Sequence, residues 1–133
     1  MEQINLSCGC GQYEIHATAV LCGGDLSVTL CGGTLMHVGA VSLAVYEPER
    51  DSATVSTVTV FTHRDDYLSS RVAKQLSSAL KCTVTVTAGV HIDSAAPDDI
   101  KRFCEAADAL ALALCGEITL QRAAAPTLPG QPL

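Results

Sequence analysis

The sequence predicts a two-layer α+β domain, in which a mixed sheet of five or six strands carries two helices on one face. Four stretches rich in apolar and β-branched residues come first, then an amphipathic helical pattern, one more strand-like run and a second helical pattern. A chain of 133 residues fits one domain, which buries roughly two thirds of its unfolded surface. We expect this domain to cover residues 1–122. Residues 123–133 hold three prolines and are expected to form a disordered tail.

The first two predicted strands form a hairpin. Apolar residues alternate with polar ones over residues 13–19, the period of a strand with one solvated face. His16 lies on the polar face, and we expect it to be solvated. The segment Cys22–Asp25, with its two central glycines, is typical of a hairpin turn into the strand Leu26–Leu30.

The next two strands form a second hairpin. Residues 38–46 are apolar almost throughout, which predicts a central strand covered on both faces. A polar turn over residues 47–52 follows, and the strand 53–61 then alternates valine with threonine.

Two helices and one more strand complete the domain. An apolar residue recurs every four positions from Leu68 to Leu80, which predicts an amphipathic helix over residues 65–80. The strand 84–90 follows, and a right-handed crossover lays it parallel to the strand 53–61. Pro97, followed by two aspartates, marks the start of the last helix, and Gly116 is expected to end it before the apolar stretch 117–120.

The composition restricts the setting of the protein. A net charge of −6 with only eight basic residues argues against a nucleic-acid binder, which needs clustered lysine and arginine. No apolar run reaches the length of a membrane span, and the start lacks the pattern of a signal peptide, so we expect a cytoplasmic protein. Seven cysteines in such a chain are expected to be reduced thiols. Cys8 and Cys10, with Cys22 and Cys31, could hold a soft metal, but their spacing differs from that of structural zinc sites.

Three histidines are the main candidate functional residues. His37 precedes the third strand, His63 follows the fourth, and His91 follows the fifth. The antiparallel hairpin and the parallel crossover would bring all three to one rim of the sheet. Gly39 and Gly89 place small residues beside the imidazoles, which would suit a large flat ligand.

Two kinds of ligand are compatible with this rim. Both helices are expected to begin there, so a phosphate could bind at their N-termini beside Arg64. Alternatively, the three histidines with Asp93 could hold a divalent metal that activates water, as in a metal-dependent hydrolase or lyase. A structural reading of residues 63–66 is also open, with Asp65 as a helix N-cap.

Three segments in this order, residues 37–41, 62–66 and 87–93, resemble a known family. They are similar to the small accessory proteins of UbiD-type hydroxyarylic acid decarboxylases, the D subunit of gallate decarboxylase systems, a family of prenylated-flavin chaperones. The resemblance covers about residues 24–116, and Gly89–Asp93 is its most specific part. Where the family has lysine after the second histidine, this chain has Arg64, which keeps the charge.

The resemblance implies a non-catalytic carrier that binds prenylated FMN, or FMN, and supports its maturation or its delivery to the decarboxylase. A UbiD-type decarboxylase and a flavin prenyltransferase are the implied partners, and a purely structural subunit of a decarboxylase complex is a further alternative. A homodimer is expected, because the short chain has only 4% aromatic residues that could stack on a flavin, and a second copy would double the surface around the ligand. The residues assigned to the cofactor are His37, Gly39, His63, Arg64, Asp65, Gly89, His91 and Asp93.

Overall fold

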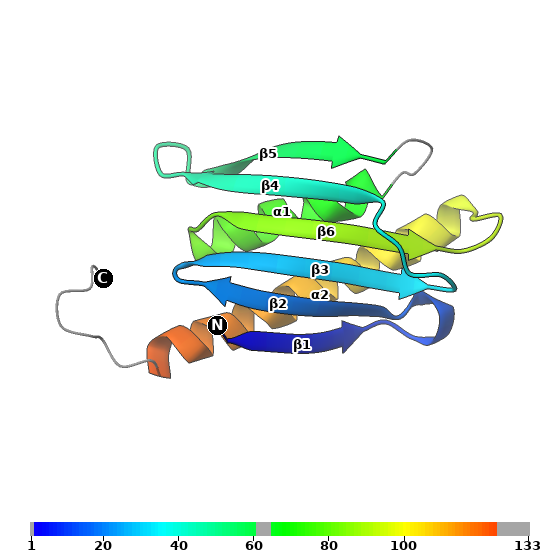
Figure 1. Ribbon diagram of the computed structural model, residues 1–133, viewed down its shortest axis with the longest axis horizontal. Coiled ribbons are helices and arrows are strands. Elements are labelled where there is room, and N and C mark those ends of the chain that lie inside the picture. Colours follow the sequence, from blue (N-terminus) through cyan, green and yellow to red (C-terminus); the bar gives the residue numbers. More distant parts are fainter. Residues whose placement is uncertain (1, 61–64, 125–133) are drawn as a thin grey trace.

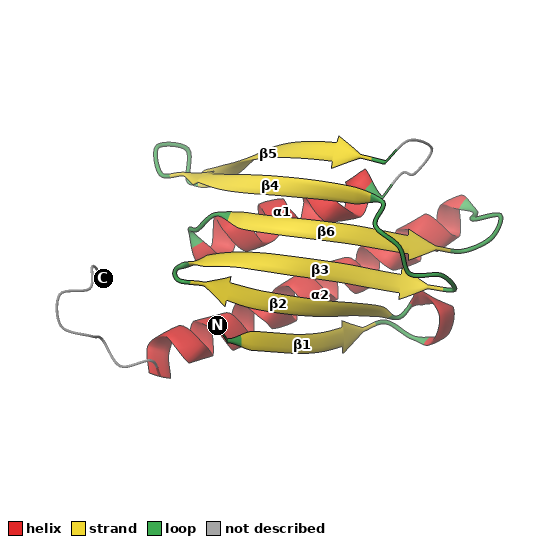
Figure 2. Ribbon diagram, viewed as in Figure 1, coloured by secondary structure: helices red, strands yellow, loops and turns green. Residues whose placement is uncertain are grey.

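The computed structural model describes residues 2–60 and 65–124 of the chain. It has a six-stranded mixed sheet with two helices packed on one face, as the sequence predicts (Figures 1 and 2). The elements in chain order are β1 (Gln3–Cys8), a short 3-10 helix η1 (Gly11–Tyr13), β2 (Ile15–Cys22), β3 (Asp25–Gly33), β4 (Ala40–Glu47), β5 (Ser52–Thr59), α1 (Asp66–Leu80), β6 (Val84–His91) and α2 (Pro97–Ala124).

Two antiparallel hairpins, the edge strand β1 and one inserted strand make the sheet. Its order is β1-β2-β3-β6-β4-β5. A tight turn joins β2 to β3, with Cys22 opposite Asp25 and Gly23 at a φ of +63°, a left-handed conformation that glycine adopts without strain. β4 pairs with β5 in the predicted antiparallel hairpin.

The strand β6 lies between the two hairpins. It runs parallel to β3 and antiparallel to β4, so it is parallel to β5 in direction, as the crossover through α1 predicts, but β4 separates the two. The end of β3, the start of β4 and the end of β6 therefore meet at one rim of the sheet.

The core lies between the sheet and the helices. The predicted stripe of α1 is buried against the strands, since Leu68, Val72 and Leu76 have no exposed surface. Such side chains each contribute about 1.5–3 kcal/mol on burial. Neither of the two described helices is long and apolar enough to cross a membrane.

The last helix is longer than predicted. α2 continues through Gly116 to Ala124, two residues beyond the expected end of the domain. Leu114 and Ile118 lie one turn apart on the same buried stripe, and their packing offsets the roughly 1 kcal/mol cost of a glycine in a helix. The expected end at Gly116 was wrong. The predicted tail lies outside the described residues from position 125 onward.

The first strand was missed. β1 pairs antiparallel with β2, and Ile4 is its one buried residue. Its apolar positions alternate with polar ones, but the segment is only six residues long.

One face of the sheet carries neither helix, and we call it the open face. Figure 1 shows both helices behind the sheet and the segment between β3 and β4 crossing in front of it. Alternate residues of β4, Val41, Leu43 and Val45, are 40–45% exposed on this face. The expectation that this strand is covered on both faces was wrong for the single chain, because the described helices form one layer only.

Candidate functional site

Two of the three predicted histidines meet at one rim of the sheet. Gly33 pairs with His91 at the ends of β3 and β6, and Ala40 begins β4 opposite Ala88. The loop 34–39, which carries His37, crosses in front of the end of β6 (Figure 1). We call these strand ends and this loop the histidine rim.

Asp65 fixes His37 to the rest of the rim. It precedes α1 and is only 4% exposed. Its Oδ1 accepts the backbone N–H of Val90 at 3.0 Å, and its Oδ2 lies 3.0 Å from Nε2 of His37. A carboxylate can only accept, so Nε2 of His37 is the donor. Asp65 occupies the N-cap position of α1, as the structural reading predicts, but its side chain makes no capping bond to the helix.

The two glycines assigned to the cofactor have packing roles. A Cβ atom on Gly39 would overlap the carboxylate of Asp65, and one on Gly89 would overlap the backbone carbonyl of His37. Both positions therefore need glycine so that the loop can lie against β6 and α1. Their closeness to the imidazoles is as predicted, and a direct contact with a ligand stays a prediction.

Both the backbone and the side chain of His91 make polar contacts. Its backbone carbonyl accepts the N–H of Thr34 at 2.7 Å and the hydroxyl of Thr34 at 3.1 Å. Its Nε2 lies 2.8 Å from Oδ1 of Asp93, and its side chain is 40% exposed. The predicted closeness of His91 and Asp93 is therefore present in the structure.

The imidazoles of His37 and His91 form one group. Their ring centroids are 6.4 Å apart and their planes meet at 78°. One ligand of flavin size can touch both rings. The structure thus brings together His37, Asp65, His91, Asp93 and the two glycines, whereas His63 and Arg64 lie outside the described residues.

The described part of the rim does not form a metal site. Within residues 2–60 and 65–124, no group of three or more His, Cys, Asp or Glu side chains is arranged to hold a metal ion. This includes Cys8, Cys10, Cys22 and Cys31, and all seven cysteines are free thiols. The three-histidine site needs His63, so the metal alternative stays a prediction.

Both helices already carry carboxylates at their N-termini. Asp66 lies in the first turn of α1, beside the buried Asp65. In α2, Asp99 accepts the N–H of Ala96 at 2.8 Å and the hydroxyl of Tyr13 at 2.5 Å. A phosphate at either end would therefore meet like charge beside the backbone donors of the helix.

Sequence reasoning missed two residues of the rim. Thr34 holds the carbonyl of His91, and Cys31 lies under the loop with Sγ 3.9 Å from the carbonyl oxygen of His37. Burial, assisted by the negative charge of Asp65, raises the pKa of the Cys31 thiol above its ordinary value. Cys31 pairs with Gly89, so only the register of β3 and β6 could have identified it.

Apolar side chains flank His37 in the loop. Leu35, Met36 and Val38 of the loop are 56–61% exposed. The described aromatic side chains make contacts of their own. Tyr13 packs edge-to-face on Phe103, Tyr46 bonds Asp51 next to the turn between β4 and β5, and Tyr67 packs against the core. Phe61 lies outside the described residues.

A solved structure shares this fold. The chain resembles a chain of a chaperone complex for yeast 20S proteasome assembly with a TM-score of 0.55, over 90% of this chain and 95% of that one. The two are 13% identical, so the likeness shows the fold alone.

The sequence comparisons identify a family. The chain is 29% identical over 100 residues to Protein LpdD of Lactiplantibacillus plantarum, which is 68% of this chain and 74% of that protein. The model of the prenylated flavin chaperone LpdD-like domain matches residues 9–119. This match starts earlier than the expected limit near residue 24 and includes η1 and β2. The chain therefore belongs to the prenylated flavin chaperone LpdD-like domain family.

Proposed function

We propose that this chain is a non-catalytic carrier that binds prenylated FMN at the histidine rim and delivers it to a UbiD-type decarboxylase. The observation that carries the proposal is the pairing of His37 and His91, 6.4 Å apart, in a chain of this family. In this proposal a flavin prenyltransferase supplies the cofactor, and the carrier itself makes or breaks no bond.

The rim has the chemistry that such a cofactor needs. Isoalloxazine has an N–H donor between two carbonyl acceptors along one edge. Because Nε2–H of a neutral His91 donates to Asp93, its Nδ1 atom can accept that N–H. Leu35, Met36 and Val38 offer exposed apolar surface in the same loop as His37. Arg64 is the proposed partner of the phosphate, as a charged donor of planar geometry. When bound, the cofactor supplies the reactive ring, while these residues hold and shield it.

We further propose that the carrier acts as a homodimer through the open face. Val41, Leu43, Val45 and Val58 are 40–76% exposed, and Val41 pairs with Val58 next to the rim. β4 directly follows the apolar loop that carries His37, so a second copy seated on these residues would lie beside the site. Light scattering should give twice the chain mass, and Leu43→Glu should give a monomer. A monomeric wild type would contradict this part of the proposal.

The binding proposal is tested with the cofactor itself. Protein mixed anaerobically with reduced prenylated FMN should retain it through gel filtration, with a flavin absorption band under the protein peak. His16→Ala is the matched control: His16 lies on β2, one strand away from Cys31, and its exposed ring contacts Ser7 and Glu14. No retention of either the reduced or the oxidised cofactor would exclude the carrier function.

Two measurements separate the other functions. Near-stoichiometric zinc or iron, lost when His37, His63 and His91 are replaced together by alanine, would favour the metal-dependent enzyme. Co-purification with a decarboxylase that is unchanged in the same triple variant, without cofactor retention by the wild type, would favour a structural subunit.

A further inference from the structure

The strand β5 forms an edge of the sheet that lacks the usual protection. Among the described elements it pairs only with β4. Its sequence, Ser-Ala-Thr-Val-Ser-Thr-Val-Thr over Ser52–Thr59, has no charge, proline or glycine. Edge strands usually carry lysine, proline or a bulge, which prevent pairing with another chain. An uncharged edge of this length can accept one more strand.

The hydrogen bonds identify which groups of β5 face outward. The N–H of Val60 donates to the carbonyl of Gly39 at 2.8 Å, so Val60 points its main chain towards β4. In an antiparallel pair the main-chain groups alternate between the two sides of a strand. Val55, Thr57 and Thr59 therefore present their N–H and C=O groups to the outside.

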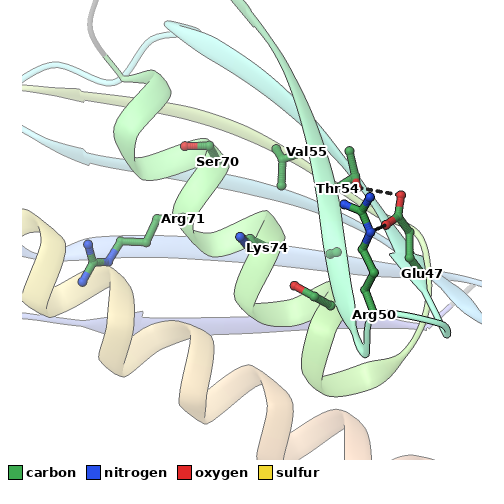
Figure 3. A pocket seen from close by; sticks show the side chains of 9 residues that line it. Glu47, Arg50, Thr54, Val55, Ser70, Arg71 and Lys74 are labelled. Atoms are coloured by element: carbon green, nitrogen blue, oxygen red, sulfur yellow. Dashed lines mark hydrogen bonds and ion pairs between the residues drawn. The ribbon is translucent and has the colours of Figure 1, made fainter.

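A basic hollow adjoins the first half of this edge. It has a volume of about 500 Å³ and lies between β5 and α1 (Figure 3). Three of the eight basic residues of the chain line it. The lining residues are Glu47, Arg50, Ser52, Ala53, Thr54, Val55, Ser70, Arg71 and Lys74.

Basic side chains outnumber acidic ones in the lining of this hollow. The one carboxylate of the lining, Glu47, accepts the hydroxyl of Thr54 at 2.7 Å and lies 3.4 Å from Nε of Arg50. Arg71 extends away from β5 towards α2, where it pairs with Asp108 (Figure 3). Lys74 makes no ion pair within the described residues. An acidic chain thus presents a local positive site beside an open strand edge.

The charges favour one occupant over another. A second copy paired through β5 would bring a strand without carboxylates and another set of the same cations. A segment with acidic side chains would instead place negative charge beside Lys74 and Arg50.

We propose that β5 binds an extended acidic segment of a partner protein, which adds to the sheet as a seventh strand with its carboxylates in the basic hollow. β5 spans about 26 Å at the rise of a strand, and its far end, Thr59, pairs with Ala40 at the histidine rim. A partner docked on this edge would therefore lie beside the rim. The proposal is independent of cofactor binding, because the edge and the hollow contain none of the residues assigned to the cofactor.

A designed peptide tests the edge directly. The probe is a capped octapeptide of four glutamate-valine repeats, and its matched control has lysine in place of glutamate. Titration calorimetry should show binding of the acidic peptide and about tenfold weaker binding, or none, of the basic one. In amide NMR spectra, the N–H signals of Val55, Thr57 and Thr59 should shift and exchange more slowly with solvent.

Two pairs of variants separate the main chain from the charge. Thr57→Pro removes an outward N–H and keeps the main-chain bonds to β4, but it also loses the hydrogen bond between the hydroxyls of Thr57 and Ser42; it should abolish binding. Thr57→Ala loses only that hydroxyl bond and should bind as the wild type does. Lys74→Glu should weaken binding of the acidic peptide about tenfold, while Lys101→Glu, the same change on an exposed lysine of α2, should not.

Equal affinity for the two peptides, or binding that survives Thr57→Pro in a folded variant, would overturn the proposal. Self-association that Thr57→Pro abolishes, with no peptide binding, would show that a second copy occupies the edge instead. Cofactor retention by the same variants is expected to be unchanged, so failure here and failure of the carrier function give different results.

Discussion

Asp65 joins His37 to β6: its Oδ2 accepts Nε2–H of His37, and its Oδ1 accepts the backbone N–H of Val90, each at 3.0 Å. The carboxylate lies where β4 and β6 separate, so it replaces a main-chain acceptor that the sheet no longer supplies to Val90. The carboxylate of Asp65 thus orients the imidazole of His37 and satisfies the backbone N–H of Val90.

Asp65→Ala should therefore destabilise the protein by about 1–3 kcal/mol, because a buried N–H is left without its acceptor. Asp65→Asn keeps an acceptor for Val90 but turns an amide N–H towards His37, which should select the opposite tautomer of that ring. Urea unfolding measures the first effect, and nitrogen chemical shifts of the His37 ring measure the second. Equal stability of the two variants would mean that Asp65 does not hold Val90.

Gly39→Ala and Gly89→Ala should each destabilise the protein by about 1–3 kcal/mol, because the new Cβ displaces either the Asp65 carboxylate or the loop backbone. Gly116→Ala is the matched control. Gly116 is exposed in α2 with no atom near its Cβ position, so alanine should stabilise the helix by up to about 1 kcal/mol. Thermal unfolding compares the three. A Gly89→Ala variant as stable as the wild type would show that the loop does not pack tightly against β6.

His91→Ala should weaken retention of prenylated FMN about three- to tenfold, the loss of one hydrogen bond. Its side chain is 40% exposed and the bonds from Thr34 go to its backbone, so the free energy of unfolding should change by less than about 1 kcal/mol. Fluorescence titration and urea unfolding check the two parts, with His16→Ala as the control. A large loss of stability without cofactor would show that His91 is structural.

Arg64→Ala should weaken binding roughly tenfold to hundredfold, because it removes a charge-assisted bond to the phosphate. The affinity of the wild type should also fall with salt more steeply than that of the variant. Lys101→Ala is a matched loss of positive charge and should have little effect. An unchanged dissociation constant in Arg64→Ala would place the phosphate elsewhere.

The pair of Arg71 and Asp108, which joins α1 to α2, should make stability depend on pH. Arg71 donates to both carboxylate oxygens at 2.6 and 2.8 Å and lowers the pKa of Asp108 below its ordinary value. Because the pKa is lower in the folded chain, the contribution is complete above the ordinary value near 4 and is lost as the pH falls through the lowered value. The pair is partly exposed, so about 0.5–1 kcal/mol is expected.

Urea unfolding of the wild type and of Asp108→Asn measures this contribution. The difference in the free energy of unfolding should be present at pH 7 and should shrink towards zero as the pH approaches 2. A difference that stays constant over this range would mean that the ion pair contributes nothing.

The periodicity of the sequence was sufficient to predict most elements and their faces. The stripe of α1, the hairpin at Gly23 and the direction of β6 depend on local patterns or on a general rule of handedness, and all are present in the structure. The continuation of α2 through Gly116 was not predictable locally, because it depends on packing of Ile118 against the sheet. The open face of β4 was not predictable either, since an apolar run does not say what covers it.

The site was predictable only in part for a similar reason. His37 and His91 could be placed at one rim from strand directions, but the bond between His37 and Asp65 joins positions 28 residues apart. The bond is possible because β4 and β6 stop pairing beyond Ala40 and Ala88. Sequence periodicity does not predict where such a pairing ends. Cys31 and Thr34 lie at the site because of the register between β3 and β6, and no local sequence motif predicts their position.

The most direct test of the carrier function is the NMR signal of the imidazole nitrogens of His16, His37 and His91 during an anaerobic titration with reduced prenylated FMN. Binding at the rim predicts that the signals of His37 and His91 shift together and saturate at one cofactor per chain, while the signal of His16 stays in place. Saturable binding that leaves both rim histidines unshifted would contradict the account.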